Sequence, residues 1–154
     1  KLMSKMGYDA ATLGNHDFDN GLSGLNKVLP NANFPFLTSN YDFSNTEMNT
    51  HVKPYKIFKK DTIKIGVFGI GIELEGLVDP FLYKETKYLD PIEITQDITR
   101  TLKNDEHCDL IICLSHLGYH YKNDIDKISD LKLAAATKDI DLIIGGHTHT
   151  FLPK

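Results

Sequence analysis

The sequence lacks any long apolar segment. No run approaches the roughly 20 apolar residues that a membrane-spanning helix needs, and no signal peptide is visible. The 17 lysines and arginines are scattered rather than clustered, and the formal net charge is −4. These absences argue against a membrane span and against a general nucleic-acid-binding surface.

Cysteine is scarce as well. The chain has only Cys108 and Cys113, and Cys113 lies inside an apolar run typical of a buried strand. A strand side chain that points into a core is poorly placed to bridge to a residue five positions earlier, so we expect no disulfide between them. The pair therefore says little about the redox compartment.

The sequence predicts one domain that opens in mid-structure. Its 154 residues, 41% of them apolar, suffice for one hydrophobic core, so residues 1–154 are taken as a single domain. The first residue is Lys1 rather than methionine, and residues 2–7 resemble the last turns of a helix closed by a glycine.

Strand and helix patterns alternate along the chain. A polar stretch at 41–53 predicts a surface loop, and Asp90 predicts the N-cap of a helix. The helix that begins at Ser129 is expected to turn Leu131, Ala134 and Ala135 inward. Strands are predicted at 10–14, 34–40, 55–58, 63–70, 109–114 and 140–144, and helices at 22–29, 90–102 and from 129 onward. The runs at 55–58 and 63–70, the second with alternating apolar residues at 63–67, predict a hairpin that turns near residues 60–61. The order of strands and helices, with this hairpin, predicts an α/β layered sandwich.

Three of the apolar runs are followed by side chains of the types that bind metals in proteins. The run at 10–14 leads into Asn15, the run at 110–114 leads to His116, and the last run leads through two glycines to His147 and His149. Ligands bind α/β sheets just beyond the carboxyl ends of the strands. We therefore expect these side chains to gather at one edge of the sheet.

The expected ligands form a mixed set of one amide oxygen and three imidazoles, which suits Zn, Mn, Fe or Co. His147 and His149 are separated by one residue, so in an extended segment they point to opposite sides. They fit best as ligands of two neighbouring ions. Taken alone, a histidine at a strand end such as His116 is more often a hydrogen-bonded structural residue than a ligand.

His16 and Asp19 are predicted to form a second functional pair. His16 follows Asn15 directly and would point away from it, so it is not expected to be a metal ligand. Asp19 can accept a hydrogen bond from one ring nitrogen and leave the other to face a substrate. The acidic residues Asp124, Asp126 and Asp130 lack the glycine and glutamate of a calcium loop, and we expect them to form a solvated face.

Three motifs carry a family resemblance. Residues 14–21 (GNHDFDNG), 115–118 (SHLG) and 145–149 (GGHTH) resemble, in order and spacing, the later motifs of the calcineurin-like metallophosphoesterases, in particular the 5′-nucleotidase branch. The resemblance implies the layered α-β-β-α sandwich of that family, here only its C-terminal half. It also implies a periplasmic or secreted location.

The resemblance further implies roles for individual residues. Asn15, His116 and His147 would bind one divalent metal ion, and His149 would help to bind a second. His16 and Asp19 match the family's catalytic dyad. The implied reaction is phosphomonoester hydrolysis, with nucleoside 5′-monophosphates as substrates and a metal-bound hydroxide as the nucleophile.

The sequence departs from the family pattern at its beginning. The family opens with an aspartate and histidine motif, followed by a glycine and aspartate motif whose carboxylate bridges both metals, and neither is present. We therefore expect a missing N-terminal segment or self-association.

Other functions stay open at this level. One is a truncated, inactive domain that binds metal or a partner chain. Others are a cyclic phosphodiesterase or nucleotide-sugar hydrolase of the same family and, less favoured, a metal-dependent amidohydrolase, whose His-x-His pair lies on the first strand of a larger barrel.

Overall fold

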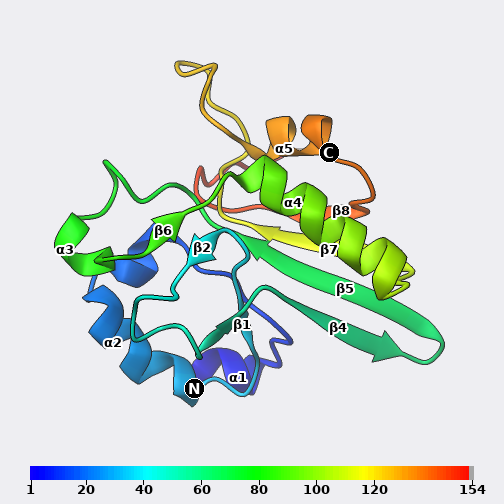
Figure 1. The fold of residues 1–154 in the computed structure, drawn as a ribbon, viewed down its shortest axis with the longest axis horizontal. Helices are drawn as coiled ribbons and strands as arrows, with labels where there is room; N and C mark the ends of the chain where they lie inside the picture. Colours follow the sequence, from blue (N-terminus) through cyan, green and yellow to red (C-terminus); the bar gives the residue numbers. More distant parts are fainter. Residues whose placement is uncertain (153–154) are drawn as a thin grey trace.

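Helices and strands alternate in the computed structural model of the protein, which describes residues 1–152 (Figure 1). The last two positions of the expected domain lie outside the described residues. The helices are α1 (Leu2–Met6), α2 (Gly21–Val28), α3 (Pro80–Tyr83), α4 (Pro91–Arg100) and α5 (Asp130–Ala136), with short turns η1 (Asn15–Phe18), η2 (Leu29–Asn31) and η3 (Thr101–Asp105). The strands are β1 (Phe36–Leu37), β2 (Tyr41–Asp42), β3 (Val52–Lys53), β4 (Tyr55–Lys60), β5 (Ile63–Ile70), β6 (Lys87–Tyr88), β7 (Leu110–Ser115) and β8 (Leu142–Ile144).

The largest sheet has the strand order β4-β5-β7-β8. β4 and β5 form the predicted antiparallel hairpin, which turns at Asp61 with a φ of 53°. β7 pairs with β5 and with β8 in the parallel sense. The parallel strands β5, β7 and β8 therefore end at the same edge of this sheet, as the sequence predicts.

The chain forms four layers. Helices α4 and α5 cover one face of the large sheet, and the small sheets β1-β3 and β2-β6, followed by α1 and α2, lie on its other side (Figure 1). This arrangement is the α/β layered sandwich that the sequence predicts. Among residues 1–152, no helix has the length and apolar character needed to cross a membrane.

Two hydrophobic cores hold the layers together. The core beneath α4 and α5 contains Phe68, Ile70, Leu102, Cys108, Ile111, Cys113, Leu117 and Leu133. The core around α2 and η1 contains Leu13, Phe18, Leu22, Leu25, Leu29, Tyr41, Phe43, Met48, Leu74 and Val78. Both cysteines are free and buried, in agreement with the expected absence of a disulfide.

The helix at α4 begins where the sequence predicts. The Asp90 carboxylate accepts hydrogen bonds from the backbone N–H groups of Ile92 and Glu93, at 2.8 and 2.9 Å, and Pro91 occupies the first turn, where its missing N–H costs nothing. Local cap chemistry is enough to set this boundary.

Two predicted strands are shorter than expected. The segment 10–14 makes only a single bridge, between Ala11 and Phe36, and the predicted strand 34–40 is reduced to β1. After β1 the backbone no longer pairs with the segment 10–14. The Ser39 N–H instead donates to the carbonyl of Gly69 at 2.8 Å. Because its partner strand β1 has only two residues, the segment 10–14 cannot form a longer run of strand pairing.

Two predictions of exposure were wrong. The segment 41–53 was expected to be a surface loop, yet Met48 is fully buried in the core around α2. In α5 the buried apolar residue is Leu133, whereas Leu131, Ala134 and Ala135 are exposed. A short helix with apolar residues around much of its circumference can present either face, and here Leu133 is the residue that packs against β7 and its neighbours.

Candidate metal centre

Asn15 lies in a tight turn that is fixed from two sides. It opens η1, where the Gly14 N–H donates to the carboxylate of Asp17 at 2.7 Å. Phe18 anchors the end of the turn, fully buried with its ring edge-on to Tyr41 at a centroid distance of 5.7 Å. The Asn15 side chain is consequently held in the interior, with 7% of its surface exposed.

His116 comes to Asn15 from the end of β7. Its backbone N–H donates to the carbonyl of Ile70 at 2.8 Å, which continues the pairing with β5 by one residue. Its Nε2 lies 3.2 Å from Asn15 Oδ1. Gly14 makes this approach possible, because a Cβ there would lie 2.6 Å from the His116 ring.

His147 arrives from the end of β8, and its Nδ1 lies 3.1 Å from the same oxygen of Asn15. The rings of His116 and His147 are 5.2 Å apart and nearly perpendicular. His147 has a φ of 71°, a left-handed conformation that is uncommon for a residue with a side chain and that recurs at functional sites. Three segments that are remote in sequence thus place three donor atoms together.

Partial burial favours the neutral form of both imidazoles. It lowers the pKa of His116, with nearby histidine charges as smaller causes. Burial also lowers the pKa of His147, where the charges of His116 and Lys127 contribute further. A neutral imidazole is the form that binds a metal, so these environments favour metal binding at neutral pH.

The two separations measured from Asn15 Oδ1 suit donor atoms that share one divalent transition metal ion. Ligand atoms that share one ion at about 2.1 Å, with angles between about 90° and 110°, are separated by about 3.0 to 3.4 Å. The separations of 3.1 and 3.2 Å from Asn15 Oδ1 fall within that range. Within residues 1–152 no three His, Cys, Asp or Glu side chains form such a group, and the group around Asn15 consists of one amide oxygen and two imidazoles.

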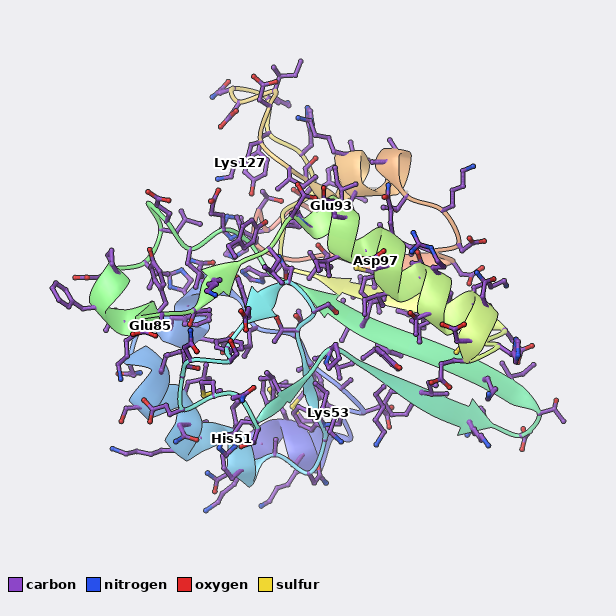
Figure 2. All side chains as sticks on the ribbon, in the orientation of Figure 1. His51, Lys53, Glu85, Glu93, Asp97 and Lys127 are labelled. Carbon is purple, nitrogen blue, oxygen red and sulfur yellow. The ribbon has the colours of Figure 1, made fainter. Side chains whose placement is uncertain are left out.

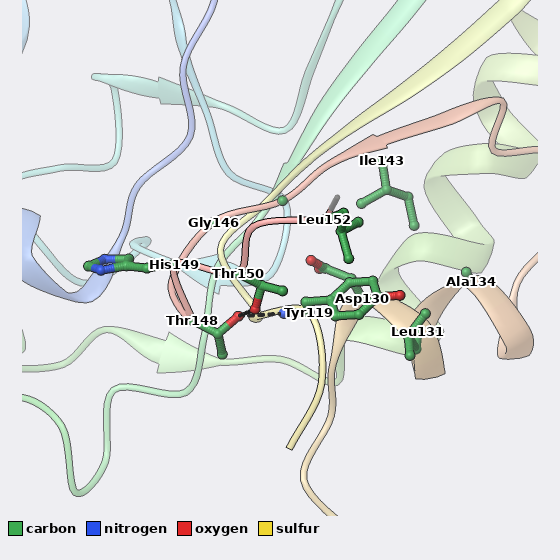
Figure 3. Close-up of a pocket in the computed structure, with 11 residues that line it drawn as sticks. Tyr119, Asp130, Leu131, Ala134, Ile143, Gly146, Thr148, His149, Thr150 and Leu152 are labelled. Carbon is green, nitrogen blue, oxygen red and sulfur yellow. Dashed lines mark hydrogen bonds between the residues drawn. The ribbon is translucent and has the colours of Figure 1, made fainter. Parts of the chain in front are cut away.

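His149 is placed beside this group rather than within it. It is exposed, with a φ of 50°, and its ring points away from Asp130 and Tyr119 (Figure 3). Its charge nevertheless contributes to the lowered pKa values of His116 and His147. This position is compatible with a ligand for a second, adjacent ion.

His16 and Asp19 make the expected side-chain contact. His16 Nδ1 lies 3.1 Å from a carboxylate oxygen of Asp19, across one turn of η1. The two side chains are 85% and 60% exposed, so Nε2 of His16 is free to meet a substrate. Neither side chain joins the group around Asn15.

A cation that the sequence reasoning missed lies next to His147. Lys127 Nζ stands 4.6 Å from the centroid of the Tyr121 ring, and that ring lies 6.5 Å from the His147 ring. The Tyr121 hydroxyl donates to the carbonyl of Leu117 at 2.6 Å, which fixes the ring. No motif includes Lys127, and only the three-dimensional structure reveals its position at the projecting loop (Figure 2).

Asp130 is buried, although the sequence predicted that it belongs to a solvated face. Asp124 and Asp126 are exposed as predicted, but Asp130 has only 7% of its surface exposed. Burial raises the pKa of its carboxyl group, and a hydrogen bond from Ser115 partly offsets this effect. The reason for its burial is position: it is the first residue of α5, packed behind the ends of β7 and β8.

Comparisons with known proteins agree on one family. A family model described as calcineurin-like phosphoesterase matches residues 1–151. A 5′-nucleotidase of Vibrio parahaemolyticus is 39% identical over 96% of this chain and 27% of its own length. The chain therefore spans about a quarter of the length of this relative.

Solved structures give the same result. The crystal structure of a 5′-nucleotidase precursor from Thermus thermophilus matches 99% of this chain and 28% of that one, with 30% identity and a TM-score of 0.87. The NAD nucleotidase of Haemophilus influenzae matches 99% of this chain and 29% of its own, with 30% identity and a TM-score of 0.80.

Proposed function

Because the chain belongs to the calcineurin-like phosphoesterase family, we propose that the protein hydrolyses phosphomonoesters and that nucleoside 5′-monophosphates are its substrates. The observation that carries the proposal is the convergence of Asn15, His116 and His147 on one point. The names of the relatives support the choice of substrate. We place the protein in the periplasm or outside the cell by the same similarity.

The proposed cofactors are two divalent ions, drawn from Zn, Mn, Fe or Co. Asn15, His116 and His147 would hold one of them, and His149 would contribute to the other. Bound there, the ions would stabilise the negative charge on the phosphoryl oxygens and activate a water molecule for attack. The lowered pKa values of the half-buried His116 and His147 favour the neutral imidazoles that this role requires.

His16 acts on the departing alcohol in this proposal. Asp19 accepts a hydrogen bond from Nδ1 and so fixes the orientation of the ring. Nε2 is left facing solvent, where it can donate a proton to the leaving oxygen or stabilise charge that develops there.

Lys127 supplies positive charge for the anionic substrate. Among the described residues no carboxylate lies within ion-pair distance of its Nζ. The face of Tyr121 holds the ammonium group at one side of His147. We assign Lys127 to binding a phosphate oxygen of the substrate.

The decisive experiment replaces His147 by alanine in the intact protein and measures AMP hydrolysis with Mn²⁺. Activity should be abolished together with Mn²⁺ binding. His51→Ala is the matched control, because His51 is exposed and lies on the far side of the molecule from Lys127 (Figure 2). Unchanged turnover in the His147 variant would contradict the assignment.

A second substrate class has specific support. One similar structure is named as an NAD nucleotidase, so dinucleotides join nucleotide sugars and cyclic phosphodiesters as candidates. Turnover of NAD at a rate above that of AMP would favour this class. Metal binding without turnover of any of these compounds would instead support an inactive metal-binding domain.

A further inference from the structure

The buried carboxylate of Asp130 is joined to the turn that carries His116. The Ser115 hydroxyl donates to Asp130 Oδ1, and the same hydroxyl oxygen accepts the N–H of Leu117 at 3.1 Å. The backbone is tied as well, because the Asp130 N–H donates to the carbonyl of Gly118 at 2.8 Å. These bonds hold the residues on either side of His116.

Asp130 also lies against the segment that carries His147. A Cβ on Gly145 would stand 2.3 Å from the other carboxylate oxygen, Oδ2. Gly145 does not belong to the glycines with positive φ, so its backbone would accept an alanine. The space taken by the Asp130 carboxylate is therefore the reason that this position requires glycine.

The surroundings of Asp130 show why one residue can serve both strand ends. It borders a pocket of about 360 Å³ that α5 and the segment 145–152 line (Figure 3). β7 and β8 are paired over three residues each, from Ile112 with Leu142 to Leu114 with Ile144. Beyond the paired residues, the Asp130 side chain contacts both the segment that continues from β7 and the segment that continues from β8.

We propose that Asp130 is a positioning residue that sets the separation of His116 from His147, and thereby the shape of the metal centre. The inference rests on the proposed function, since it treats both histidines as ligands of one ion. It assigns to Asp130 no contact with the metal or the substrate. The hydrogen bond from Ser115 fixes one histidine, and the close fit beneath Gly145 fixes the other.

The test is calorimetric titration of the intact protein with Mn²⁺, using Ser115→Ala, Asp130→Ala and Asp130→Asn. The alanine variants should lose about tenfold or more in Mn²⁺ affinity, as is usual when a partner behind a ligand is removed. Asparagine keeps the shape and an acceptor oxygen for Ser115, so it should restore most of the affinity. Asp126→Ala is the control, because Asp126 is an exposed acid of the same segment and should change nothing.

Unfolding temperatures measured in EDTA separate positioning from simple loss of fold. Ser115→Ala should keep a cooperative transition in EDTA while it loses metal affinity. A Ser115→Ala protein with wild-type Mn²⁺ affinity would overturn the inference and leave the proposed function intact. Absence of Mn²⁺ binding by the wild-type protein would instead overturn the proposed function itself.

Gly145 provides a second, independent measurement. Gly145→Ala should weaken Mn²⁺ binding by about tenfold, because the new methyl group must displace the Asp130 carboxylate. In the Asp130→Ala background the same change should cause no further loss, since the obstacle is gone. Additive losses in the double variant would show that the two residues act separately and would overturn the inference.

Discussion

Asn15 and His147 are 132 positions apart in the sequence, and the amide oxygen of the first lies 3.1 Å from Nδ1 of the second. The contact joins a turn near the start of the chain to the segment after the last strand. His116 reaches the same oxygen from the end of β7. The common edge of the parallel strands of the large sheet and a neighbouring turn therefore create a site that no local stretch of sequence contains.

His16→Asn should separate catalysis from metal binding. His16 contacts Asp19 rather than the group around Asn15, so turnover should fall by about a hundredfold while metal content stays at the wild-type level. The measurements are kcat for AMP and metal analysis of the same preparation. Equal loss of both would mean that His16 is itself a ligand.

Lys127→Ala should weaken substrate binding more than it slows the reaction. Removing an unpaired cation beside Tyr121 takes away attraction for the substrate phosphate, so KM should rise several-fold and kcat should change little. The effect should shrink in high salt, which screens charge. Lys122→Ala, an exposed lysine of the same loop, is the control, and an equal rise in its KM would remove the special role of Lys127.

Asp130→Asn should stabilise the protein at neutral pH. Burial raises the folded-state pKa of Asp130 above its unfolded value. Stability from this group is present below the unfolded pKa, near 3.9, and is lost as pH rises through the folded pKa. An asparagine side chain does not ionise, so the variant does not lose this stability. Its advantage in unfolding temperature over the wild-type protein, measured in EDTA, should be greatest at pH 7 and should disappear toward pH 4. An advantage that does not vary with pH would exclude this cause.

Neither cysteine should react with a maleimide in the native protein. Both are buried, at 3% exposed for Cys108 and 0% for Cys113, and burial raises the pKa of each thiol. Thiolate is the reactive form, so both shifts slow the reaction. Mass spectrometry should find no adduct in buffer and two adducts in urea. Rapid native labelling of Cys113 would contradict the placement of β7 inside the sheet.

Local chemistry made several elements predictable from sequence. Asp90 followed by proline specified the start of α4, and the alternating pattern at 63–67 specified the β4-β5 hairpin. The contact of His16 with Asp19 also follows from a separation of three residues. The sequence motifs placed the donor residues at strand ends, but the meeting of Asn15 with both histidines required the assembled sheet.

Other features depend on packing that no local pattern encodes. Met48 lies in a polar stretch, yet the core around α2 takes it in. Leu133 is the buried apolar residue of α5, although Leu131 and the alanines offered an equally apolar face. Asp130 looked like one member of an acidic run, and its burial follows only from the position of α5 behind two strand ends. Tertiary contacts decide such cases.

Because the three donors lie far apart in the sequence, they become available at different times during synthesis of the chain. A ribosome that has translated as far as residue 116 has supplied Asn15 and His116, but the strand that delivers His147 does not yet exist. The nascent chain can therefore offer at most two of these donors until β8 and the segment after it have left the exit tunnel. In the proposed function, binding of one ion by all three donors follows that step and closes a loop that spans the 132 positions between Asn15 and His147.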